Sequence, residues 1–414
     1  MPDESKSPKR GVASVYVTYW SLRDPLCQTQ SLAYLRGLAA RGHRFALVTF
    51  EQPKYALSPE RAAEAKRELA GQGIYWYPLR YHKRFSLLAT GFDCLAGVAA
   101  GLFAAVRHGA RAVHSRASIP AAMALAVSAL SGRKFLYDSD SLLSEEYADT
   151  GHWAPGGTAY KVTAWFERQS RRRADSVVTL SERLRRAFVE DYGVRAPVAV
   201  IPCCVDEGRF RFDPRAREAR RAELGAGAET LFVYMGKVGA RYLVGETFEF
   251  FKAALGRVGP ARMLILSGDD PEAFHRIAAE RGVGRELYEV RHSAHEDVAS
   301  WLSAADVGLA FIRSARCERG SSPIKTAEYL AAGLPVVITP GIGDHSTLVE
   351  REGVGVVVDP SAGGGCEEGA ARLGALLAEG GDVLRARCRR AAERHFSLEG
   401  VGVARYEAVY EGLL

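Results

Sequence analysis

The sequence predicts an α/β protein of two doubly wound, Rossmann-like domains, each built on a parallel sheet. Three observations lead to this prediction. Short apolar runs alternate with longer helical patterns almost throughout the chain, which is typical of parallel strands covered on both faces by crossover helices. The second half of the chain repeats the alternation of the first. The length of 414 residues corresponds to about two or three domains.

Strands are predicted in the first half wherever an apolar run is bounded by turn residues. These runs are VASVYVTYW (12–20), RFALVTF (44–50), GIYWYPL (73–79), ARAVHSR (110–116), RKFLYD (133–138), DSVVTL (175–180) and PVAVIP (197–202). Helical patterns separate them. One example is SLAYLRGLAARG (31–42), for which Ser31 is predicted as the N-cap and Gly42 as the terminating residue.

The second half contains six further strand patterns. They are TLFVYMG (230–236), ARMLILSG (261–268), ELYEVRH (286–292), DVGLAFI (306–312), LPVVITP (334–340) and VGVVVD (354–359). A charged stretch without a strand pattern, 210–229, lies between the halves, so we predict domains at 1–208 and 209–396 and a final helix at 397–414. Two such domains are expected to face an interdomain cleft, because ligands bind at the carboxyl ends of the strands.

Charge and cysteine content limit the partners and the compartment. The net charge is +6, from 55 basic and 49 acidic residues, and no block of five like charges occurs, so we expect no nucleic-acid partner. The cysteines number seven and none lies in a C-x-x-C pair, which favours reduced thiols in the cytoplasm. The polar N-terminus, MPDESKSPKRG, does not resemble a signal peptide.

The longest apolar run, 87–106, is interrupted by Asp93 and three glycines. A membrane span needs about 20 apolar residues with few or no charges, so this run is a poor candidate for one. We predict a buried helix here, with weak peripheral contact at the inner face of a membrane as the alternative.

Common nucleotide and hydrolase motifs are absent. The sequence has no G-x-x-x-x-G-K-[ST] and no G-x-G-x-x-G after its first strand pattern, which argues against a P-loop NTPase and a dinucleotide dehydrogenase. It also lacks H-E-x-x-H and G-x-S-x-G, which argues against the common zinc proteases and α/β-hydrolases.

The segment 306–345 has the strongest functional pattern. A strand pattern ends at Ile312, and after a polar loop Pro323 lies near the start of a helix, where its missing N–H costs nothing. A helix N-terminus offers free N–H groups and a partial positive charge, which suits a phosphate group. Ser321 and Ser322 add hydroxyl donors at this end of the helix.

Two charged residues in this helix indicate a ligand. Lys325 lies in the first turn, where the helix dipole disfavours a cation unless an anion joins it. Glu328 follows on the same face, in reach of a neutral polyol such as ribose. A solvated lysine beside a surface acid is the alternative, but the Ser-Ser-Pro sequence and the glycines of GIGD (341–344) favour a ligand site.

The motif S-S-P-x-K-x-x-E-Y-L-A-x-G-L-P-V resembles the donor site of glycosyltransferase family 4, a family of retaining enzymes with the GT-B fold. Other passages resemble the same family, and the last of them resembles a tail helix that crosses back onto the first domain. They are DPLCQTQSLAYLRGLAARGH (24–43), VHSRASIP (113–120), AVIPCCVDEGRF (199–210), HEDVASWLSAADVGLAFI (295–312) and FSLEGVGVARYEAVYEGLL (396–414).

The resemblance implies roles for individual residues of the second domain. Lys325 would hold the donor diphosphate and stabilise the leaving phosphate, and Lys237, after Gly236, would meet the same diphosphate. Glu328 would bind the ribose hydroxyls. The backbone near Arg291 and His292 would face the nucleobase, and Gly341 and Gly343 would let the backbone approach the sugar or phosphate. The hydroxyl donors Ser321 and Ser322 complete the candidate donor site.

The sequence departs from the family where a second glutamate is usual. The position eight residues before Glu328 is Gly320, and Glu318 lies two residues earlier. A second basic residue after Lys237 is not evident, although Arg241 is near. These departures leave the identity of the donor sugar open.

The resemblance places the acceptor in the first domain. The candidate acceptor-binding residues are Gln28, Arg116, Asp138 and Asp140. Arg116 ends a strand pattern and would point into the cleft, with an ion pair to a neighbouring acid as the alternative. Asp138-Ser139-Asp140 also spells the D-x-D motif of metal-binding GT-A enzymes, but the phosphate-binding features lie in the other half, so we favour acceptor binding or loop capping and expect no metal or other cofactor.

Together these patterns predict a retaining, metal-independent glycosyltransferase. Its partners would be a nucleotide-diphosphate sugar donor and a glycan or lipid-linked acceptor, as in polysaccharide biosynthesis. Two alternatives stay open, namely a non-catalytic nucleotide-sugar-binding protein of the same fold and a non-hydrolysing nucleotide-sugar epimerase.

Overall fold

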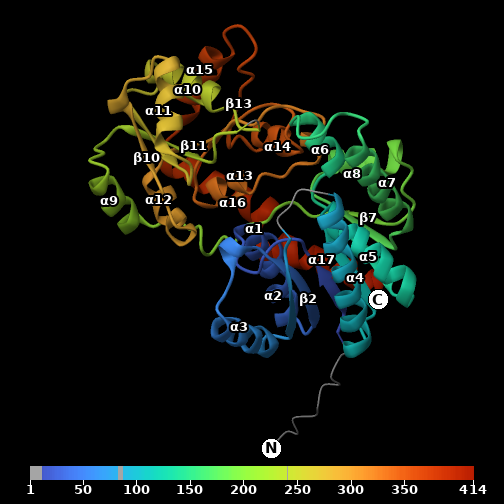
Figure 1. Cartoon of the computed structure of the whole chain (residues 1–414). Coiled ribbons are helices and arrows are strands. Elements are labelled where there is room, and N and C mark those ends of the chain that lie inside the picture. The colour runs from blue at the N-terminus through green and yellow to red at the C-terminus, as the bar shows by residue number, and fades with distance from the viewer. Residues whose placement is uncertain (1–11, 83–86, 240) are drawn as a thin grey trace, which may run out of the picture. The chain divides into compact units, whose positions relative to one another are not determined.

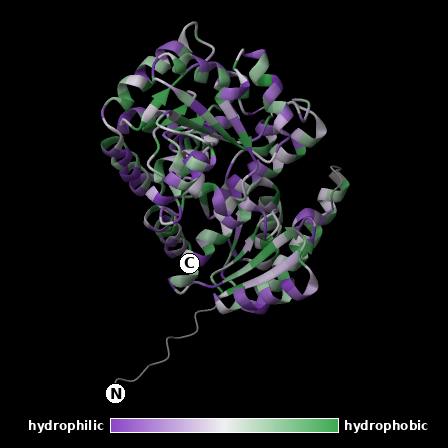
Figure 2. Cartoon of the chain, turned by 90° about the vertical axis from the view of Figure 1, so that its left-hand side faces the viewer, coloured by the Kyte–Doolittle hydropathy of each residue, from purple (hydrophilic) through white to green (hydrophobic). Residues whose placement is uncertain are grey.

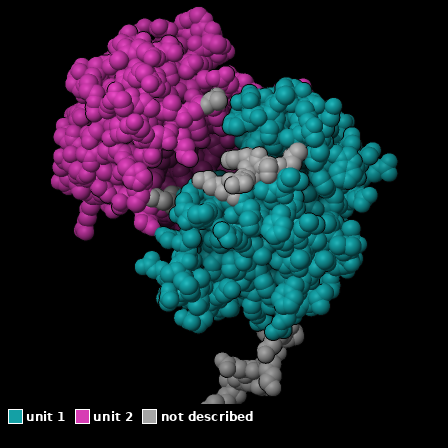
Figure 3. Space-filling view, in the orientation of Figure 1, with its two compact units in different colours: residues 1–180, 184–201, 402–414 teal, residues 181–183, 202–401 magenta. Residues whose placement is uncertain are grey.

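The computed structural model describes residues 12–82, 87–239 and 241–414, which form two compact units (Figures 1 and 3). Unit 1 comprises the described residues up to Leu180 together with Leu184–Ile201 and Gly402–Leu414, and unit 2 comprises Ser181–Arg183 and Pro202–Val401. The N-terminal segment MPDESKSPKRG lies outside the described residues.

Unit 1 is built on a seven-stranded sheet with the order β3-β2-β1-β4-β5-β6-β7, in which every pairing is parallel. The strands are β1 (Ser14–Val17), β2 (Phe45–Glu51), β3 (Ile74–Arg80), β4 (Ala112–Arg116), β5 (Lys134–Ser139), β6 (Ser176–Thr179) and β7 (Val198–Val200). The helices between them are α1 (Pro25–Cys27), α2 (Ala33–Ala40), α3 (Pro59–Gly71), α4 (Leu87–His108), α5 (Ser118–Ser131), α6 (Leu143–Asp149), α7 (Thr158–Arg173) and α8 (Glu182–Arg186).

Alternate side chains of the central strands face two different layers of helices. Val15 and Val113 pack into the core beneath α4 and α5. One residue further along, Tyr16 packs its ring against His114, and His114 contacts Tyr410 of the last helix, α17 (Ala404–Leu413). The last helix therefore completes the second face of the unit 1 sheet.

A buried polar cluster joins α17 to this sheet. The Arg116 guanidinium lies 2.7 Å from an Asp138 carboxylate oxygen, and the Tyr406 hydroxyl donates to the same oxygen at 2.5 Å. The Tyr410 hydroxyl lies 2.7 Å from His114 Nδ1. Although burial opposes ionisation, Arg116 and its neighbours hold the pKa of Asp138 below its ordinary value, so the carboxylate stays charged within this cluster.

Unit 2 repeats the architecture with a six-stranded parallel sheet of order β10-β9-β8-β11-β12-β13. Its strands are β8 (Thr230–Met235), β9 (Ala261–Leu266), β10 (Tyr288–Arg291), β11 (Val307–Ala310), β12 (Val336–Ile338) and β13 (Gly355–Val357). Its helices are α9 (Pro214–Glu223), α10 (Val244–Leu255), α11 (Pro271–Glu280), α12 (Val298–Ala304), α13 (Ile324–Ala331), α14 (His345–Glu352), α15 (Gly365–Leu377) and α16 (Gly381–Phe396). In Figure 2 the strands of both sheets are mainly hydrophobic, while the covering helices carry both colours.

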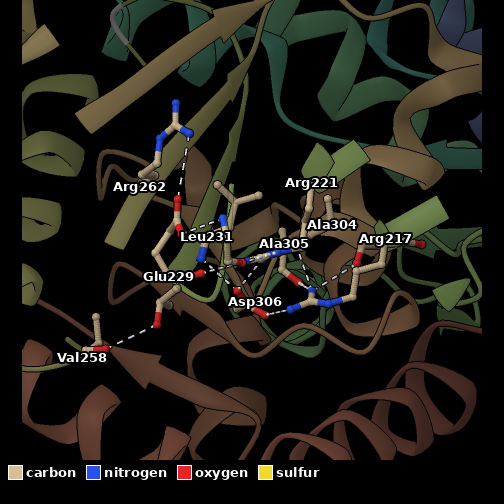
Figure 4. Close-up of polar contacts among 12 residues, drawn as sticks. Arg217, Arg221, Glu229, Leu231, Val258, Arg262, Ala304, Ala305 and Asp306 are labelled. Atoms are coloured by element: carbon tan, nitrogen blue, oxygen red, sulfur yellow. Dashed lines mark hydrogen bonds and ion pairs between the residues drawn. The ribbon is translucent and has the colours of Figure 1, made fainter. Parts of the chain in front are cut away.

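Helix α9 is fixed to unit 2 by a charge network around Asp306, the residue before β11 (Figure 4). The Asp306 carboxylate lies 2.7 Å from Arg217 and 3.2 Å from Arg221, and it accepts from the N–H of Leu231 at 2.8 Å. Arg217 also donates to the carbonyls of Ala304 and Ala305. The charged stretch between the halves thus begins unit 2 rather than forming a free linker.

The strand predictions are confirmed, because each predicted run overlaps one strand of these two sheets, with ends that differ by a few residues. The prediction that Ser31 caps a helix is wrong. The helical segment begins at Pro25 with Asp24 as its N-cap, and it continues through a π-helical turn over Gln28–Leu32 into α2. Proline at the first helical position after a capping aspartate is a stronger start signal than Ser31, whose hydroxyl instead accepts from Tyr16.

The prediction that the apolar run 87–106 is buried is also wrong for one face of α4. The apolar window of this helix is 28% buried, and by length and composition alone the helix could cross a membrane. Asp93, Gly97 and Gly101 face the unit, where side chains such as Met123 and Val127 lie so close to the glycines that a Cβ atom would clash. The other face is exposed and apolar.

Removing the Tyr406 hydroxyl should destabilise unit 1. We expect Tyr406→Phe to lower the free energy of unfolding by about 1–3 kcal/mol, because the buried Asp138 carboxylate loses a donor. Chemical denaturation followed by circular dichroism would measure this. Tyr160→Phe, at a position with no hydrogen bond recorded among the described residues, is the matched control, and equal stability of both variants would contradict the prediction.

Candidate donor site

The predicted donor-site residues of unit 2 gather at the carboxyl ends of β8, β11 and β12. Each strand continues into a connecting segment, and the described parts of these segments are residues 236–239 with 241–243, 311–323 and 339–344. Helix α13 begins directly after the second loop, with Pro323 as its N-cap and no side chain bonded to its free N–H groups. In a parallel sheet these ends share one edge, which is the usual ligand position.

The ammonium group of Lys325 is packed into this edge. Its Nζ lies 4.0 Å from the centre of the Tyr242 ring, and a Cβ atom on Gly236 would come within 2.9 Å of it. Burial lowers the pKa of Lys325, and Tyr242 and Glu328 offset part of this effect. Among the described residues no carboxylate lies within ion-pair distance of Lys325. Glycine at 236 is thus needed to make room for a cation that has no paired anion.

Glu328 lies one turn further along α13 and is 6% exposed. Burial raises the pKa of its carboxyl group to about 7, although the nearby positive charge of Lys325 lowers it. No hydrogen bond or ion pair of this carboxyl group is recorded within the described parts of the chain. A buried carboxyl group without hydrogen-bond donors lowers the stability of the fold unless a ligand supplies those donors.

Arg241, in contrast, has a carboxylate partner. Its Nε lies 2.9 Å from Glu318 Oε1, and its Nη2 donates to the Ser321 hydroxyl at 2.8 Å. Ser321 in turn donates to Glu318 at 2.5 Å. The acid that lies two residues before Gly320 is therefore part of a closed network, which sequence reasoning missed because Arg241 and Glu318 are far apart along the chain.

Ser322 is also engaged with the protein. Its hydroxyl accepts from the N–H of Cys203 at 3.0 Å and lies 2.9 Å from Nε2 of the buried His345. Burial lowers the pKa of His345 to about 3, so the imidazole is neutral, and it stacks on Phe396. His345 was not predicted as a site residue. Its position directly after the glycine loop was the only signal in the sequence.

The two glycines of the third loop approach protein atoms closely. A Cβ atom on Gly343 would lie 1.9 Å from the carbonyl oxygen of Ser321, and one on Gly341 would lie 2.7 Å from the Ser314 hydroxyl. Both residues have positive φ angles, 43° and 81°. The glycines therefore shape the loop against residues 314–321.

The remaining donor-site candidates lie around this centre. Lys237 is exposed, and its carbonyl accepts from the Tyr234 hydroxyl at 3.0 Å. The Arg291 guanidinium pairs with Glu289 and Glu223 and lies over Trp301, so its side chain is occupied by protein partners. The backbone of Arg291 accepts from Ser267, and His292 is exposed beside Gly268.

The candidate acceptor residues are not brought together at one surface of unit 1. Arg116 and Asp138 are 2% and 0% exposed and serve the α17 cluster, which favours the ion-pair alternative over direct acceptor contact and corrects the expectation that Arg116 points into a cleft. Gln28 donates to the carbonyl of Leu22. Burial raises the pKa of the partly exposed Asp140 to about 7. Within the described residues, no group of three His, Cys, Asp or Glu side chains could hold a metal ion.

Comparison with solved structures defines the class of fold as GT-B. The chain superposes on sucrose-phosphate synthase from Thermosynechococcus elongatus with a TM-score of 0.71 at 16% identity, covering 96% of this chain and 98% of that one. It superposes on HepE of Anabaena, in complex with UDP and glucose, with a TM-score of 0.67 at 14% identity, covering 96% and 98%. At such identities the likeness establishes the fold alone.

Family comparisons specify the class further. The family described as "Glycosyl transferase 4-like domain" matches residues 27–204, and "Glycosyl transferases group 1" matches residues 229–378. The chain belongs to the GT-B glycosyltransferases of the family 4 type.

A sequence relative is the GDP-mannose-dependent alpha-(1-6)-phosphatidylinositol monomannoside mannosyltransferase of Mycolicibacterium smegmatis. It is 28% identical over 230 residues, which are 55% of this chain and 58% of the relative. The match thus spans less than two thirds of the relative's length.

Glu328 should make the stability of the protein depend on pH. Its folded-state pKa of about 7 lies above the ordinary value. The contribution of the protonated carboxyl group to the free energy of unfolding is therefore fully present below pH 4.5 and is lost as the pH rises through 7. We expect Glu328→Gln to stabilise the ligand-free protein by up to about 3 kcal/mol at pH 8 and little at pH 4.5. Thermal unfolding at both pH values, with the exposed Glu280→Gln as control, would measure this. A pH-independent difference would contradict it.

Proposed function

We propose that the protein is a retaining, metal-independent glycosyltransferase that moves a sugar from a nucleotide-diphosphate donor to a glycan or lipid-linked acceptor. The observation that carries the proposal is the partly buried ammonium of Lys325 at the start of α13, beside the buried carboxyl group of Glu328. The described residues supply neither a carboxylate partner for the first nor a hydrogen-bond donor for the second. A diphosphate would supply the missing anion, and a ribose would supply the missing hydroxyl donors.

The proposed chemistry is stabilisation of the departing diphosphate. The bond between the anomeric carbon and the phosphate oxygen breaks while the acceptor oxygen bonds to the same carbon. The leaving phosphate takes the acceptor proton, and attack occurs on the face that the diphosphate leaves. Lys325, Lys237 and the free N–H groups of α13 would stabilise the charge that develops on this phosphate, which is electrostatic catalysis without a metal ion.

Two similar proteins suggest which nucleotides to test first. The mycobacterial relative is named as GDP-mannose-dependent, and the Anabaena HepE structure contains UDP. Arg241 is held by Glu318, so the cations free to meet either diphosphate are expected to be Lys325 and Lys237.

Nucleotide binding should stabilise the protein through Lys325. We expect UDP or GDP, at about 100 times its dissociation constant, to add about 2.7 kcal/mol of stability, which a thermal-shift experiment detects easily. The shift should persist in EDTA. It should be lost in Lys325→Ala and reduced in Gly236→Ala, whose new methyl group would displace the ammonium.

Lys252→Ala, which removes an exposed lysine of α10, is the control and should respond like wild type. A shift that requires a divalent metal and ignores Lys325 would contradict the proposal. Conversion of the donor in the absence of an acceptor would favour an epimerase instead, and an inverted product would contradict retention.

We further propose that the protein works in the cytoplasm and contacts the inner face of the membrane through α4. The contact surface is a stripe of five apolar side chains at helical spacing, each between 58% and 86% exposed: Leu88, Phe92, Leu95, Phe103 and Val106. The exposed Arg107 ends the stripe, and a basic residue at this position favours anionic lipid head groups.

Acidic substitutions in the stripe should weaken membrane binding. We expect Leu95→Asp/Phe103→Asp to reduce co-sedimentation with vesicles containing anionic phosphatidylglycerol at least tenfold, because two charges would enter the lipid interface. Val383→Asp, at an exposed apolar position of α16 in unit 2, should bind like wild type. Wild-type protein that stays in the supernatant would refute the proposed contact.

A further inference from the structure

A buried carboxylate under α4 orients a histidine at the edge of unit 1. Asp93 is the acidic residue of α4 and is 0% exposed. One of its oxygens lies 2.6 Å from His82 Nδ1, and the other accepts from the Tyr19 hydroxyl at 2.6 Å and from the N–H of His82 at 3.2 Å. Asp93 is therefore held by three contacts and fixes the His82 ring.

This arrangement determines what His82 can offer to a ligand. With the Asp93 carboxylate accepting the Nδ1 proton, the imidazole in its neutral form presents Nε2 as a hydrogen-bond acceptor. The His82 side chain is 39% exposed, and no partner of Nε2 is recorded in the described part of the chain. The His82 and Phe92 rings pack perpendicular to each other, with their centres 4.9 Å apart.

His82 lines a pocket of about 780 Å³ at the carboxyl ends of β2 and β3. Its walls combine polar side chains (Glu51, Arg80, Tyr81, His82) with apolar ones (Ala89, Phe92). This volume lies within the range of small-molecule sites, and the strand ends are where such sites occur in parallel sheets.

Glu51 provides a second acceptor in the pocket. Its Oε1 accepts from Thr49 at 2.6 Å and from the N–H of Leu22 at 3.0 Å, which fixes the carboxyl group. No contact of Oε2 is recorded among the described residues. Two oriented acceptors, Glu51 and His82 Nε2, match a ligand that donates from several hydroxyl groups, and the face of Phe92 offers an apolar surface to a ring.

The same helix extends the pocket into the exposed stripe. Ala89 and Phe92 line the pocket, while Leu88, Phe92 and Leu95 begin the stripe on α4. A molecule with a hydroxylated ring in the pocket could thus lay a hydrocarbon chain along the helix. This continuity favours an amphiphile over a free sugar.

We propose that this pocket binds the hydroxylated head group of an amphiphilic acceptor, with His82 Nε2 and Glu51 as hydrogen-bond acceptors. The inference rests on the proposed function in one respect, because only a glycosyltransferase would use the bound amphiphile as its acceptor substrate. Binding of the amphiphile to the pocket can be tested separately. His82 is a positioning residue for the head group, and Asp93 sets its tautomer.

Saturation-transfer NMR with octyl glucoside, below its micelle concentration, tests the pocket on the full chain. We expect saturation of both the sugar-ring and the alkyl protons in wild-type protein. His82→Phe keeps an aromatic ring against Phe92 but removes the acceptor, so ring-proton saturation should fall at least fivefold. His82→Gln, whose amide oxygen can replace Nε2, should retain part of it. The exposed His152→Phe should match wild type.

Two other outcomes of this experiment would overturn the proposal. Saturation confined to the alkyl protons in wild type would show detergent contact only, and ring-proton saturation that persists in His82→Phe would place the ring elsewhere. The nucleotide thermal shift, measured on the same variants, separates the two proposals. A His82→Phe protein that keeps its nucleotide shift but loses the ring signal retains the donor site, whereas absence of the shift in wild type would refute the donor site without affecting the pocket.

Discussion

The arrangement of the second unit depends on a partly buried ammonium group at the end of a helix where the helix dipole disfavours a positive charge. Lys325 lies in the first turn of α13, where the helix already carries a partial positive charge. Nearby positions are adapted to it, since Gly236 leaves it space and the Tyr242 ring lies beneath it. The aromatic face compensates part of the lost hydration, but it does not neutralise the charge. The protein therefore retains a local excess of positive potential at the strand edge.

The polar groups around Lys325 indicate how this positive potential could serve ligand binding. Glu318, Arg241 and Ser321 form a closed set in which each charge and hydroxyl has a partner. Ser322 and His345 form another. These sets hold the loops that surround Lys325 and Glu328. Among the described residues, neither of these two groups has an oppositely charged partner within ion-pair distance. A ligand gains most from electrostatic contacts when the charged groups that it meets have no other partner and the surrounding residues are already fixed by hydrogen bonds. Little reorganisation is then needed when the ligand binds.

Much of this could be predicted from local sequence patterns. Parallel strands buried on both faces require continuous apolar runs, so β1–β13 stand out without knowledge of their partners. Lys325 and Glu328 belong to one helical turn, so their proximity also follows from spacing alone.

Contacts between distant residues could not be predicted in this way. Nothing near Arg241 indicates Glu318, and nothing near Arg116 distinguishes a residue that meets a ligand from one buried against Tyr406. The exposure of α4 was missed for a similar reason. Its apolar residues surround the helix, and only the packing of Gly97 and Gly101 against α5 determines which side is covered.

The position of α17 has a consequence for how the chain folds as it is synthesised. Unit 1 contains the earliest residues and also residues 402–414, whereas nearly all of unit 2 is the continuous stretch between them. Until the ribosome has delivered Tyr406 and Tyr410, the first sheet lacks part of the cover for one face, and Arg116, Asp138 and His114 lack the hydroxyl groups of these two tyrosines. The second unit can close its core before that moment. The half of the enzyme that is translated first is thus the half that is completed last, and an N-terminal fragment ending at residue 201 would lack the helix that completes one face of its sheet.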